Sequence, residues 1–577
     1  MNSLVMALVA FVLYIIAYHT YGKYLARKIF GLREDVVTPA HELEDGVDYV
    51  PTRKEIVFGH HFTSIAGLGP IVGPAIAIIW GWLPAILWVV LGSIFMGAVH
   101  DFGALVASLR NKGKSIGELT SELVNPRTRT LFFLIIFFEL WIVIAIFAMI
   151  MGILFNMYPQ AVFPVWMEIP IALWLGWMVY KRNANVTVLS IVAIILMYVT
   201  VVIGAYWPLK MPSFLGLSSI EIWLIILLVY SFIASTLPVW TLLQPRDYIN
   251  AHELMIVMAL LILGTLIAHP KIVAPAVNHN PVGAPTIWPF LFVIIACGAI
   301  SGFHSLVSSG TSAKQIDKET DAQFVGYGGM LMEGSLATLV IVAVAAGIGI
   351  KYVTKDGAVL MGFQAWNTHY SSWLAAAGLG SKLTAFITGS ANLIESLKIP
   401  YAIAVTIMGV FIVSFAGTTL DTATRIQRYV LGEFFTDIKL PALANRYVAT
   451  FIAVLTAGLL AFAQKGGKGA LILWPLFGTV NQLLAGLALL VTTVYLAKKR
   501  KPIVFTLIPM IFMLFMTGWA MVKNISSFQA KHNYLLFSIG LVVFLLEIWM
   551  IIEAVLALNK YLKQPKEIET AAEEASE

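Results

Sequence analysis

Several ionisable side chains lie inside segments that are otherwise apolar, and they are the first candidates for chemistry. A charged side chain within a bilayer costs ~2.5 kcal/mol or more on insertion scales, so it is retained mainly where it functions. A buried carboxylate or imidazole can bind and release a proton as its surroundings open and close, which is the minimal requirement for proton coupling. The candidates for proton coupling are Glu333, Asp421, His100, Asp101 and Glu139.

Two of these residues have an evident structural alternative in the sequence. Asp421 could pair with Arg425, one helical turn away, and Asp101 could pair with Arg110 or with a lysine of the following loop. Glu333 has no charged partner nearby in the chain. It is therefore the strongest candidate for carrying the coupling proton.

An apolar segment at residues 59–84 contains helix-breaking residues in its middle, namely Gly67, Gly69, Pro70, Gly73 and Pro74. Proline removes a backbone donor, and glycine tolerates dihedral angles that other residues avoid. Irregular backbone at membrane depth is tolerated only where it is buried in protein or lines a wet cavity. We predict a broken helix whose second half offers free amides and a positive dipole end to a carboxylate or other anion. The alternative is that the glycines allow close helix packing.

A second interruption is predicted at Pro238, inside the apolar segment 219–243 and among several hydroxyl side chains. It lies five segments after the first, a spacing that suits two inverted repeats of five helices, each beginning with a discontinuous helix. A simple proline kink is the alternative. The candidates for substrate binding, taken from both interruptions and one later segment, are His60, His61, Ser64, Gly67, Gly69, Pro70, Gly73, Ser235, Thr236 and His304.

A third polar segment, ACGAISGFHSLVSSGTSAKQ, is rich in small hydroxyl residues near its inner end. Hydroxyl and carbonyl oxygens suit a small hard cation such as Na⁺. A sodium site at Ser308, Ser309 and Thr311 is therefore the alternative to proton coupling. Small-residue packing between helices would explain the same pattern without an ion.

The composition is that of an all-α polytopic membrane protein. The chain has 577 residues, of which 59% are hydrophobic and 12% charged, and its mean hydropathy is +0.86. Soluble domains carry roughly 25% charged residues. About fifteen apolar runs are each close to the ~20 residues that a membrane-spanning helix needs. They cover approximately residues 3–22, 64–80, 84–109, 130–156, 162–180, 185–206, 219–243, 249–268, 287–308, 324–350, 400–424, 447–463, 471–497, 503–522 and 535–557.

The basic residues orient these runs. With the amino terminus outside, most of the 37 Lys and Arg residues fall in cytoplasmic loops, and the carboxy terminus is cytoplasmic as well. The net charge of +6 is therefore a topology signal, and we expect no nucleic-acid partner. The only cysteine, Cys297, cannot form a disulfide within the chain. The sequence leaves the oligomeric state open.

We expect no enzymatic activity and no cofactor beyond a coupling ion. The string GGKG at residues 466–469 lacks the Ser or Thr and the preceding strand of a phosphate loop, and no HExxH, GxSxG or CxxC motif is present. A membrane-embedded metalloenzyme could in principle use His60, His61, His100 and Asp101, but their spacing matches no zinc pattern. A channel, which would pass solute without proton movement, is the other alternative.

Several long strings in the chain resemble the carbon starvation protein (CstA) family. They are GHHFTSIAGLGPIVGP, GSIFMGAVHDFGALVASLRNKGKSIGE, ACGAISGFHSLVSSGTSAKQI, GYGGMLMEG, TTLDTATRIQRY and LWPLFGTVNQLLA, and the resemblance runs from about residue 3 to 500. It implies a bacterial or archaeal inner-membrane transporter of peptides or pyruvate that acts in nutrient limitation. It also implies a relationship to amino acid–polyamine–organocation transporters, and therefore a LeuT-like inverted repeat.

Together these observations predict a proton symporter for a short peptide or pyruvate, divided into four regions. Residues 1–58 form a peripheral first helix and a cytoplasmic loop, and residues 59–218 and 219–432 form the two repeats. Residues 433–577 form peripheral helices and an acidic tail, which we expect to be disordered. Residues 373–395 are expected to form a short helix that lies on the surface or re-enters the membrane.

Overall fold

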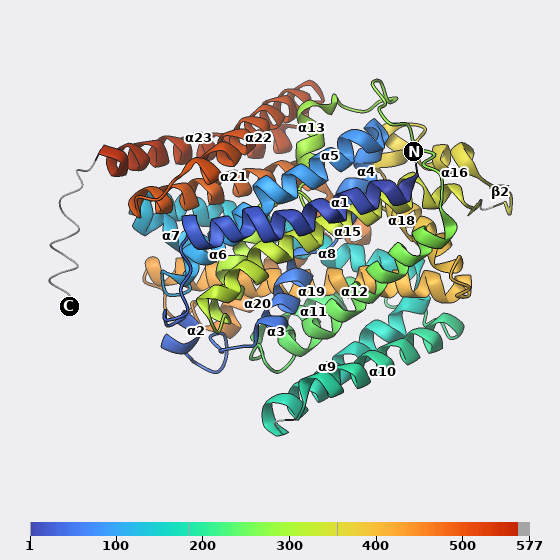
Figure 1. Ribbon diagram of the computed structural model, residues 1–577, viewed down its shortest axis with the longest axis horizontal. Coiled ribbons are helices and arrows are strands. Elements are labelled where there is room, and N and C mark those ends of the chain that lie inside the picture. The colour runs from blue at the N-terminus through green and yellow to red at the C-terminus, as the bar shows by residue number, and fades with distance from the viewer. Residues whose placement is uncertain (1, 183, 355, 564–577) are drawn as a thin grey trace.

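The computed structural model describes residues 2–182, 184–354 and 356–563, and it is helical almost throughout. In this part of the chain, the named strands are β1 (Tyr352–Val353) and β2 (Val359–Leu360), which form one antiparallel pair. Figure 1 shows most long helices running along the longest axis of the molecule. The predicted all-α class is therefore confirmed. The acidic tail lies outside the described residues.

Twelve helices in the described chain are long and apolar enough to cross a membrane, which makes this a multi-pass membrane protein. The spans without π-helical turns are built on α8 (Pro126–Met157), α9 (Val162–Arg182), α10 (Val186–Tyr206), α11 (Ser219–Thr236), α12 (Leu243–Ala268), α19 (Tyr401–Asp437), α21 (Trp474–Lys498), α22 (Val504–Ala530) and α23 (Tyr534–Lys563). Three further spans contain short π-helical turns, and they are built from α1 (Ser3–Ala17), from α5 (Trp82–Gly92) with α6 (Ala98–Leu109), and from α15 (Gly328–Ala345).

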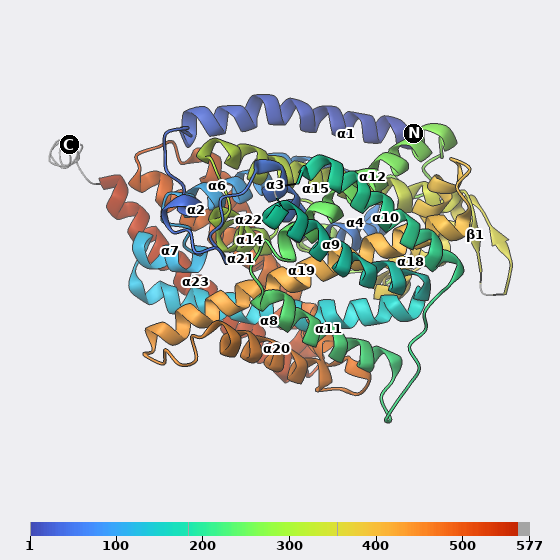
Figure 2. The same cartoon turned by 90° about the horizontal axis from the view of Figure 1, so that it is seen from below.

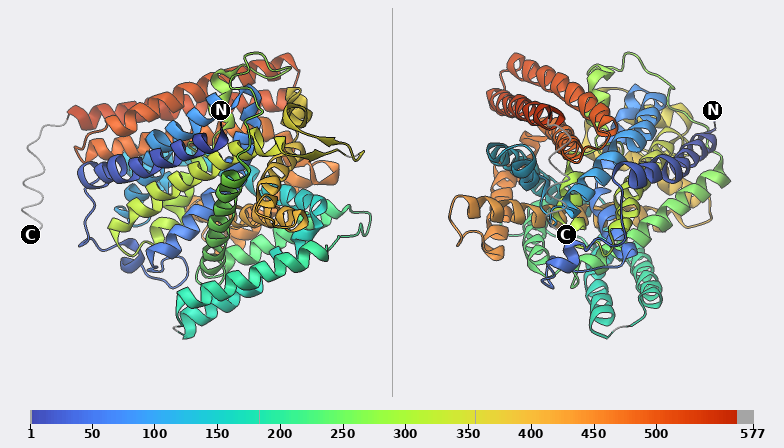
Figure 3. Two further views of the ribbon diagram at one scale, coloured as in Figure 1. Left: turned by 45° about the vertical axis from the view of Figure 1, so that its right-hand side comes forward. Right: turned by 60° about the vertical axis from the view of Figure 1, so that its left-hand side comes forward.

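The burial of these spans separates a core from a periphery. Helices α21, α15 and α19 are enclosed almost completely, whereas α10 and α23 expose most of their surface. Figure 3 shows the pair α9 and α10 on one side of the bundle and α22 and α23 on another. Large apolar side chains on the exposed faces, such as Ile195 and Leu545, are what lipid-facing helices require.

The first predicted break is present. Helix α3 (Lys54–Ile65) ends before Gly67, and α4 (Gly69–Ala77) begins beyond it at an angle of 45°. Pro70 lies in the first turn of α4, where a missing N–H leaves no helix bond unmade. The glycines also permit close packing: a Cβ on Gly69 would lie 2.3 Å from Cys297 Sγ, and one on Gly73 would lie 2.5 Å from a backbone oxygen.

The second break is not at Pro238, and this prediction was wrong. Helix α11 ends at Thr236, and Pro238 lies in the connection to α12. Proline commonly follows a helix end because it cannot continue the helix. The second interrupted segment is instead 287–310, which forms α13 (Ile287–Ile294) and α14 (Gly302–Gly310) with non-helical backbone between them. Because both pieces are short, neither qualifies as a span alone.

The two broken segments occupy matching positions among their neighbours. Helix α3 packs along α12, and α14 packs along α21. The short helices α7 (Ile116–Leu123) and α18 (Leu379–Glu395) pack on α8 and α19, respectively, and α8 and α19 pack extensively on each other. Helix α20 (Arg446–Phe462) contacts α19 and α8, much as α11 does.

The remaining short helices lie at the two ends of the bundle. Figure 2 shows α2 (Pro39–Glu42) and α7 at one end, and α18 with strand β1 at the other. We call the first the basic end, because Arg110, Lys314 and Arg428 lie there, and the second the α18 end. Residues 373–395 form α17 (Trp373–Ala377) and α18, and α16 (Gly362–Tyr370) precedes them.

Candidate functional site

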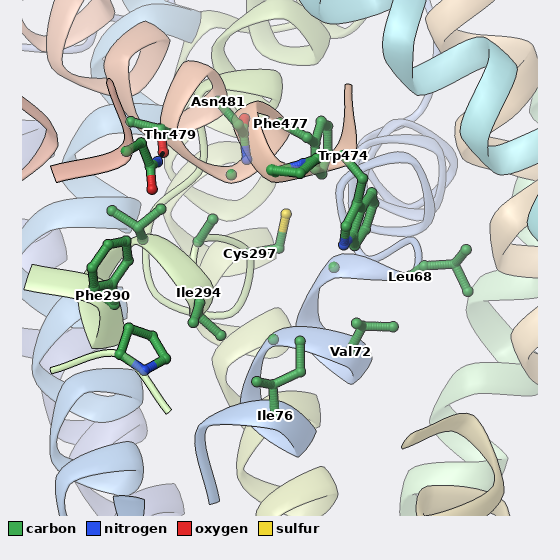
Figure 4. Close-up of a pocket in the computed structure, with 18 of the residues that line it drawn as sticks. Leu68, Val72, Ile76, Phe290, Ile294, Cys297, Trp474, Phe477, Thr479 and Asn481 are labelled. Carbon is green, nitrogen blue, oxygen red and sulfur yellow. Dashed lines mark hydrogen bonds between the residues drawn. The ribbon is translucent and has the colours of Figure 1, made fainter. Parts of the chain in front are cut away.

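A cavity of about 940 Å³ lies between the two broken segments. Figure 4 shows Leu68, Val72 and Ile76 on one wall, opposite residues of α13 and α21. Most of its lining is apolar or aromatic, as small-molecule sites generally are. Residues on the wall include Gly67, Leu68, Gly69, Val72, Gly73, Ile76, Phe147, Phe290, Ile294, Cys297, Phe303, Thr419, Trp474, Phe477, Thr479 and Asn481.

The charged side chains on the cavity wall all have one sign. They are Lys382, Lys523 and Lys531, and no Asp or Glu lines the cavity in the described chain. Fixed cations in a low-dielectric cavity favour an anion over a cation. The backbone of the first break, at Gly67 to Gly69, faces the same space. The wall therefore suits a small solute with an apolar body and a negative group.

Of the predicted substrate residues, the break itself reaches the cavity and the others do not. Gly67, Gly69 and Gly73 line it, whereas the histidines His60, His61 and His304 are absent from its wall. The remaining substrate candidates that lie away from the wall are Ser64, Pro70, Ser235 and Thr236. The glycines that interrupt the helix therefore predicted the position of the cavity, whereas the polar side chains did not.

Behind the cavity lies a fully buried group that we call the imidazole–carboxylate cluster, formed by His100, Asp101, His304 and Glu333. His304 Nδ1 is 3.0 Å from Asp101 Oδ2, and its Nε2 is 3.3 Å from Glu333 Oε2. His100 Nδ1 is 2.7 Å from Asp101 Oδ1. The Gly298 amide donates a 3.0 Å hydrogen bond to Glu333 Oε1. The imidazole of His304 thus lies between two carboxylates.

The second break connects this cluster to the cavity. Cys297 lines the cavity, and its Sγ donates to Ser301 Oγ at 3.3 Å. Asn481, also on the wall, bonds Ser301 Oγ. One donor atom each from Cys297, His304 and Glu333 lie within 4.8 Å of one another, so this group could hold a metal ion. Cys297 therefore lies on the cavity wall and close to both His304 and Glu333.

Arg110 is engaged elsewhere, so the predicted pairing with Asp101 is wrong. Its Nε donates to Glu319 Oε1 at 2.6 Å, and its Nη atoms donate to the carbonyls of Phe30 and Gly31. Asp101 therefore owes its ionic partners to helix packing across α6 and α14, which sequence spacing does not reveal.

A second buried polar group, which we call the arginine cluster, surrounds Arg246 of α12. Its guanidinium pairs with Asp421 and, at 3.0 Å, with Asp247, and Glu168 lies 3.8 Å from its Nε. The Tyr230 hydroxyl donates to Asp421 at 2.9 Å. Sequence reasoning assigned Arg246 to a loop and missed this cluster. The adjacent Arg and Asp beside Pro245 in an apolar region were the available signal.

The adjacent histidines of α3 bind different partners. His60 Nδ1 is 2.7 Å from Asp247, and its Nε2 is 2.9 Å from Thr311 Oγ1. His61 Nδ1 is 2.9 Å from Ser312 Oγ, and its Nε2 has no hydrogen-bond partner in the described chain. Both rings therefore tie α3 to the end of α14 and the segment that follows it. They do not converge on one metal-binding point.

Two hydroxyls of the predicted sodium site are engaged by different elements. Ser309 accepts the backbone N–H of Ile116 on α7, and Thr311 bonds His60 on α3. Ser308 Oγ is buried and has no partner among the described residues.

The other predicted residues lie within the helix packing. Ser64 Oγ is 3.0 Å from Thr422 Oγ1, Ser235 donates to a backbone carbonyl of α19, and Thr236 bonds its own helix. Glu139 is fully buried in α8, and its carboxylate has no hydrogen-bond partner in the described part of the chain.

At the basic end, an ion-pair group that we call the basic-end latch joins α19 to the segment before α3. Arg425 and Arg428 of α19 pair with Asp48 at 2.8 and 2.9 Å. Arg425 therefore binds Asp48 and not Asp421, contrary to the one-turn spacing. Although burial opposes ionisation, Arg428, Arg425 and Lys314 hold the pKa of Asp48 well below its usual range. This carboxylate stays charged at any physiological pH.

The chain matches a known protein family along most of its length. The family model described as carbon starvation protein CstA matches residues 2–520. The peptide transporter CstA of Bacillus subtilis is 33% identical, over 91% of this chain and 91% of its own length. The peptide transporter CstA of Campylobacter jejuni is 32% identical, over 92% and 82%. The pyruvate/proton symporter BtsT of Escherichia coli is 33% identical, over 88% and 80%.

The fold also resembles that of a solved membrane transporter. A mutant of the Eremococcus coleocola manganese transporter superimposes with a TM-score of 0.52 at 12% identity, covering 90% of this chain and 99% of that one. At this identity the likeness concerns the fold alone.

Proposed function

Because the chain belongs to the carbon starvation protein CstA family, we propose that it is a secondary active transporter that takes up a short peptide or pyruvate together with a proton. The names of its relatives, peptide transporter and pyruvate/proton symporter, support this class of solute and this coupling. The proposal requires a small-molecule substrate and a membrane, and it assigns no bond-making step to the chain.

One observation carries the proposal beyond family membership. The cavity between the broken segments has an apolar wall with lysines and no carboxylates, and a cluster of buried carboxylates and imidazoles lies behind it. A peptide and pyruvate share a small apolar body and a carboxylate. In this proposal the carboxylate binds the free amides at Gly67 to Gly69, where α4 begins.

The coupling proton is assigned to the imidazole–carboxylate cluster, with Glu333 as its main carrier. An ionised Glu333 accepts a charge-assisted hydrogen bond from the Gly298 amide, and protonation weakens that bond. Gly298 has φ +88° and belongs to the second break. Protonation of Glu333 therefore loosens the hinge between α13 and α14, which also forms part of the cavity wall.

The arrangement of the ends corresponds to an outward-facing state if the amino terminus is outside. The basic end is then cytoplasmic and is closed by the basic-end latch, whereas the cavity wall extends to residues 283–286 and Lys382 at the α18 end. We further propose that two inverted repeats form the core, one running from α3 to α12 and one from α13 to α21. In this arrangement α9 and α10 form a hairpin inserted into the first repeat. The second repeat then begins at α13 and not at residue 219, as the sequence had predicted.

The proposal is tested by uptake into proteoliposomes of labelled pyruvate, dipeptides and tripeptides under imposed proton or sodium gradients. We expect accumulation to follow the proton gradient. Accumulation that follows only sodium would transfer the coupling role to a site such as Ser308, Ser309 and Thr311. Uptake indifferent to both gradients would rule out symport and favour a channel.

A further inference from the structure

Lys382 is a buried lysine that has no partner among the residues the structure describes. It lies at the end of the first turn of α18 and lines the cavity, with 4% of its surface exposed. Among the described residues, its ammonium group makes no salt bridge and no hydrogen bond. A buried charge without a partner is strongly unfavourable.

The position of Lys382 in its helix adds to this cost. The amino-terminal turn of a helix carries a partial positive charge and favours anions. A lysine there is repelled by the helix that carries it. Burial alone lowers the pKa of Lys382 to about 7, with no neighbouring charge to oppose the shift. Among the described residues no side chain stabilises the ammonium form, so an anion bound in the cavity would supply the counter-charge.

The two other lysines on the cavity wall differ from Lys382 in their surroundings. Lys523 is only partly buried and Lys531 is exposed, both in or next to the last turns of α22. Water screens their charges, so each contributes little to binding a solute. Of these three lysines, Lys382 is the buried one, and an anion that pairs with it would therefore be bound most strongly.

We propose that Lys382 binds the carboxylate of the transported solute at the α18 end of the cavity, before the solute reaches the first break. This inference rests on the proposed function, because it assigns a residue to the carboxylate that the proposal places in this cavity. The solute would thereby complete an ion pair that the empty protein lacks. A solute without a negative group would gain nothing from Lys382.

The test measures binding of two matched probes to the purified full-length protein: alanyl-alanine and its carboxy-terminal amide. Hydrogen bonds to charged groups are worth enough to change affinity roughly 10- to 100-fold. We expect wild type to prefer the free carboxylate by this factor and Lys382→Met to lose the preference. Lys382→Arg should retain most of it, and Lys468→Met, at an exposed lysine away from the cavity wall, should change it less than about two-fold.

The same variants separate this inference from the proposed function. Wild type that fails to accumulate or bind any carboxylate solute would overturn both. Wild type that accumulates alanyl-alanine, together with Lys382→Met that keeps the preference for the carboxylate, would overturn the Lys382 inference alone. Because Lys382→Met removes an unpaired buried charge, we expect its thermal stability to equal or exceed that of wild type. A marked loss of stability in both Lys382→Met and Lys382→Arg would show a structural role and would also contradict the inference.

Discussion

The two broken segments face the same cavity but present different groups to it. The first break, between α3 and α4, is short and bent by 45°, and it offers backbone amides and small residues to the cavity. The second, between α13 and α14, is longer, and its Gly298 amide binds Glu333 while Cys297 faces the cavity. In the proposed mechanism, the first break binds the carboxylate of the solute and the second break is the hinge that responds to the proton on Glu333.

The largest effect is expected from removing the charge at the proton-sensing hinge. Glu333→Gln should abolish gradient-driven accumulation of the solute while exchange across the membrane is less affected, because the amide cannot carry the proton. The measurement compares accumulation with counterflow in proteoliposomes. Glu547→Gln, at a buried glutamate of the peripheral helix α23, is the matched control and should accumulate solute normally. Unchanged accumulation by Glu333→Gln would remove this residue from the coupling role.

A second prediction concerns how the binding of the solute carboxylate depends on pH. Lys382 binds an anion only when protonated, and burial lowers its pKa to about 7. The preference for alanyl-alanine over its amide should therefore be full below pH 7 and fall about ten-fold per pH unit well above it.

The side chains around Lys382 allow this effect to be isolated. His369 bonds Ser381, the neighbour of Lys382, and burial lowers the pKa of His369, which favours its neutral form. Lys523 and Lys531 share the cavity wall but are less buried than Lys382. Lys382→Arg should make the preference independent of pH. A preference in wild type that is constant from pH 6 to 9 would contradict this account.

A smaller effect is expected from stiffening the hinge itself. At Gly298 an added Cβ would lie 2.8 Å from Ala337 Cβ, and φ is +88°. Gly298→Ala should lower stability by about 1–3 kcal/mol and reduce transport, because it strains the backbone that binds Glu333. Gly458→Ala in α20, where the nearest atom is 3.4 Å away, is the control and should be neutral. Thermal unfolding and uptake, measured together, check both. Equal behaviour of the two variants would show that the second break carries no strain.

The sequence predicted the class of the protein and the first break for physical reasons that are local. Apolar runs of membrane length identify spans, and a Gly–Pro cluster cannot continue a helix. The second break has no proline, only Gly298 and a Ser301 cap, so it was taken for a continuous span. Pro238 misled because proline is equally common just after a helix end.

The site was harder to predict from the sequence, because its contacts come from packing between segments that are distant in the chain. Glu333 and His304 are 29 positions apart in the chain. This spacing does not predict that the His304 imidazole lies between the carboxylates of Asp101 and Glu333. Neither Arg246 nor Lys382 was among the candidate residues that the sequence singled out. Such residues gain meaning only when the structure shows what surrounds them.

The proposed binding of the solute in the cavity is tested most directly at Cys297. It is the only cysteine, and it lies on the cavity wall between the two breaks. The measurement is the rate at which a water-soluble maleimide alkylates Cys297 in membranes, with and without alanyl-alanine or pyruvate. If the solute occupies this cavity, at least one of these carboxylates should slow alkylation in a saturable way, and alanyl-alanine amide should do so more weakly. Alkylation at the same rate with every solute that the protein accumulates would contradict the central claim.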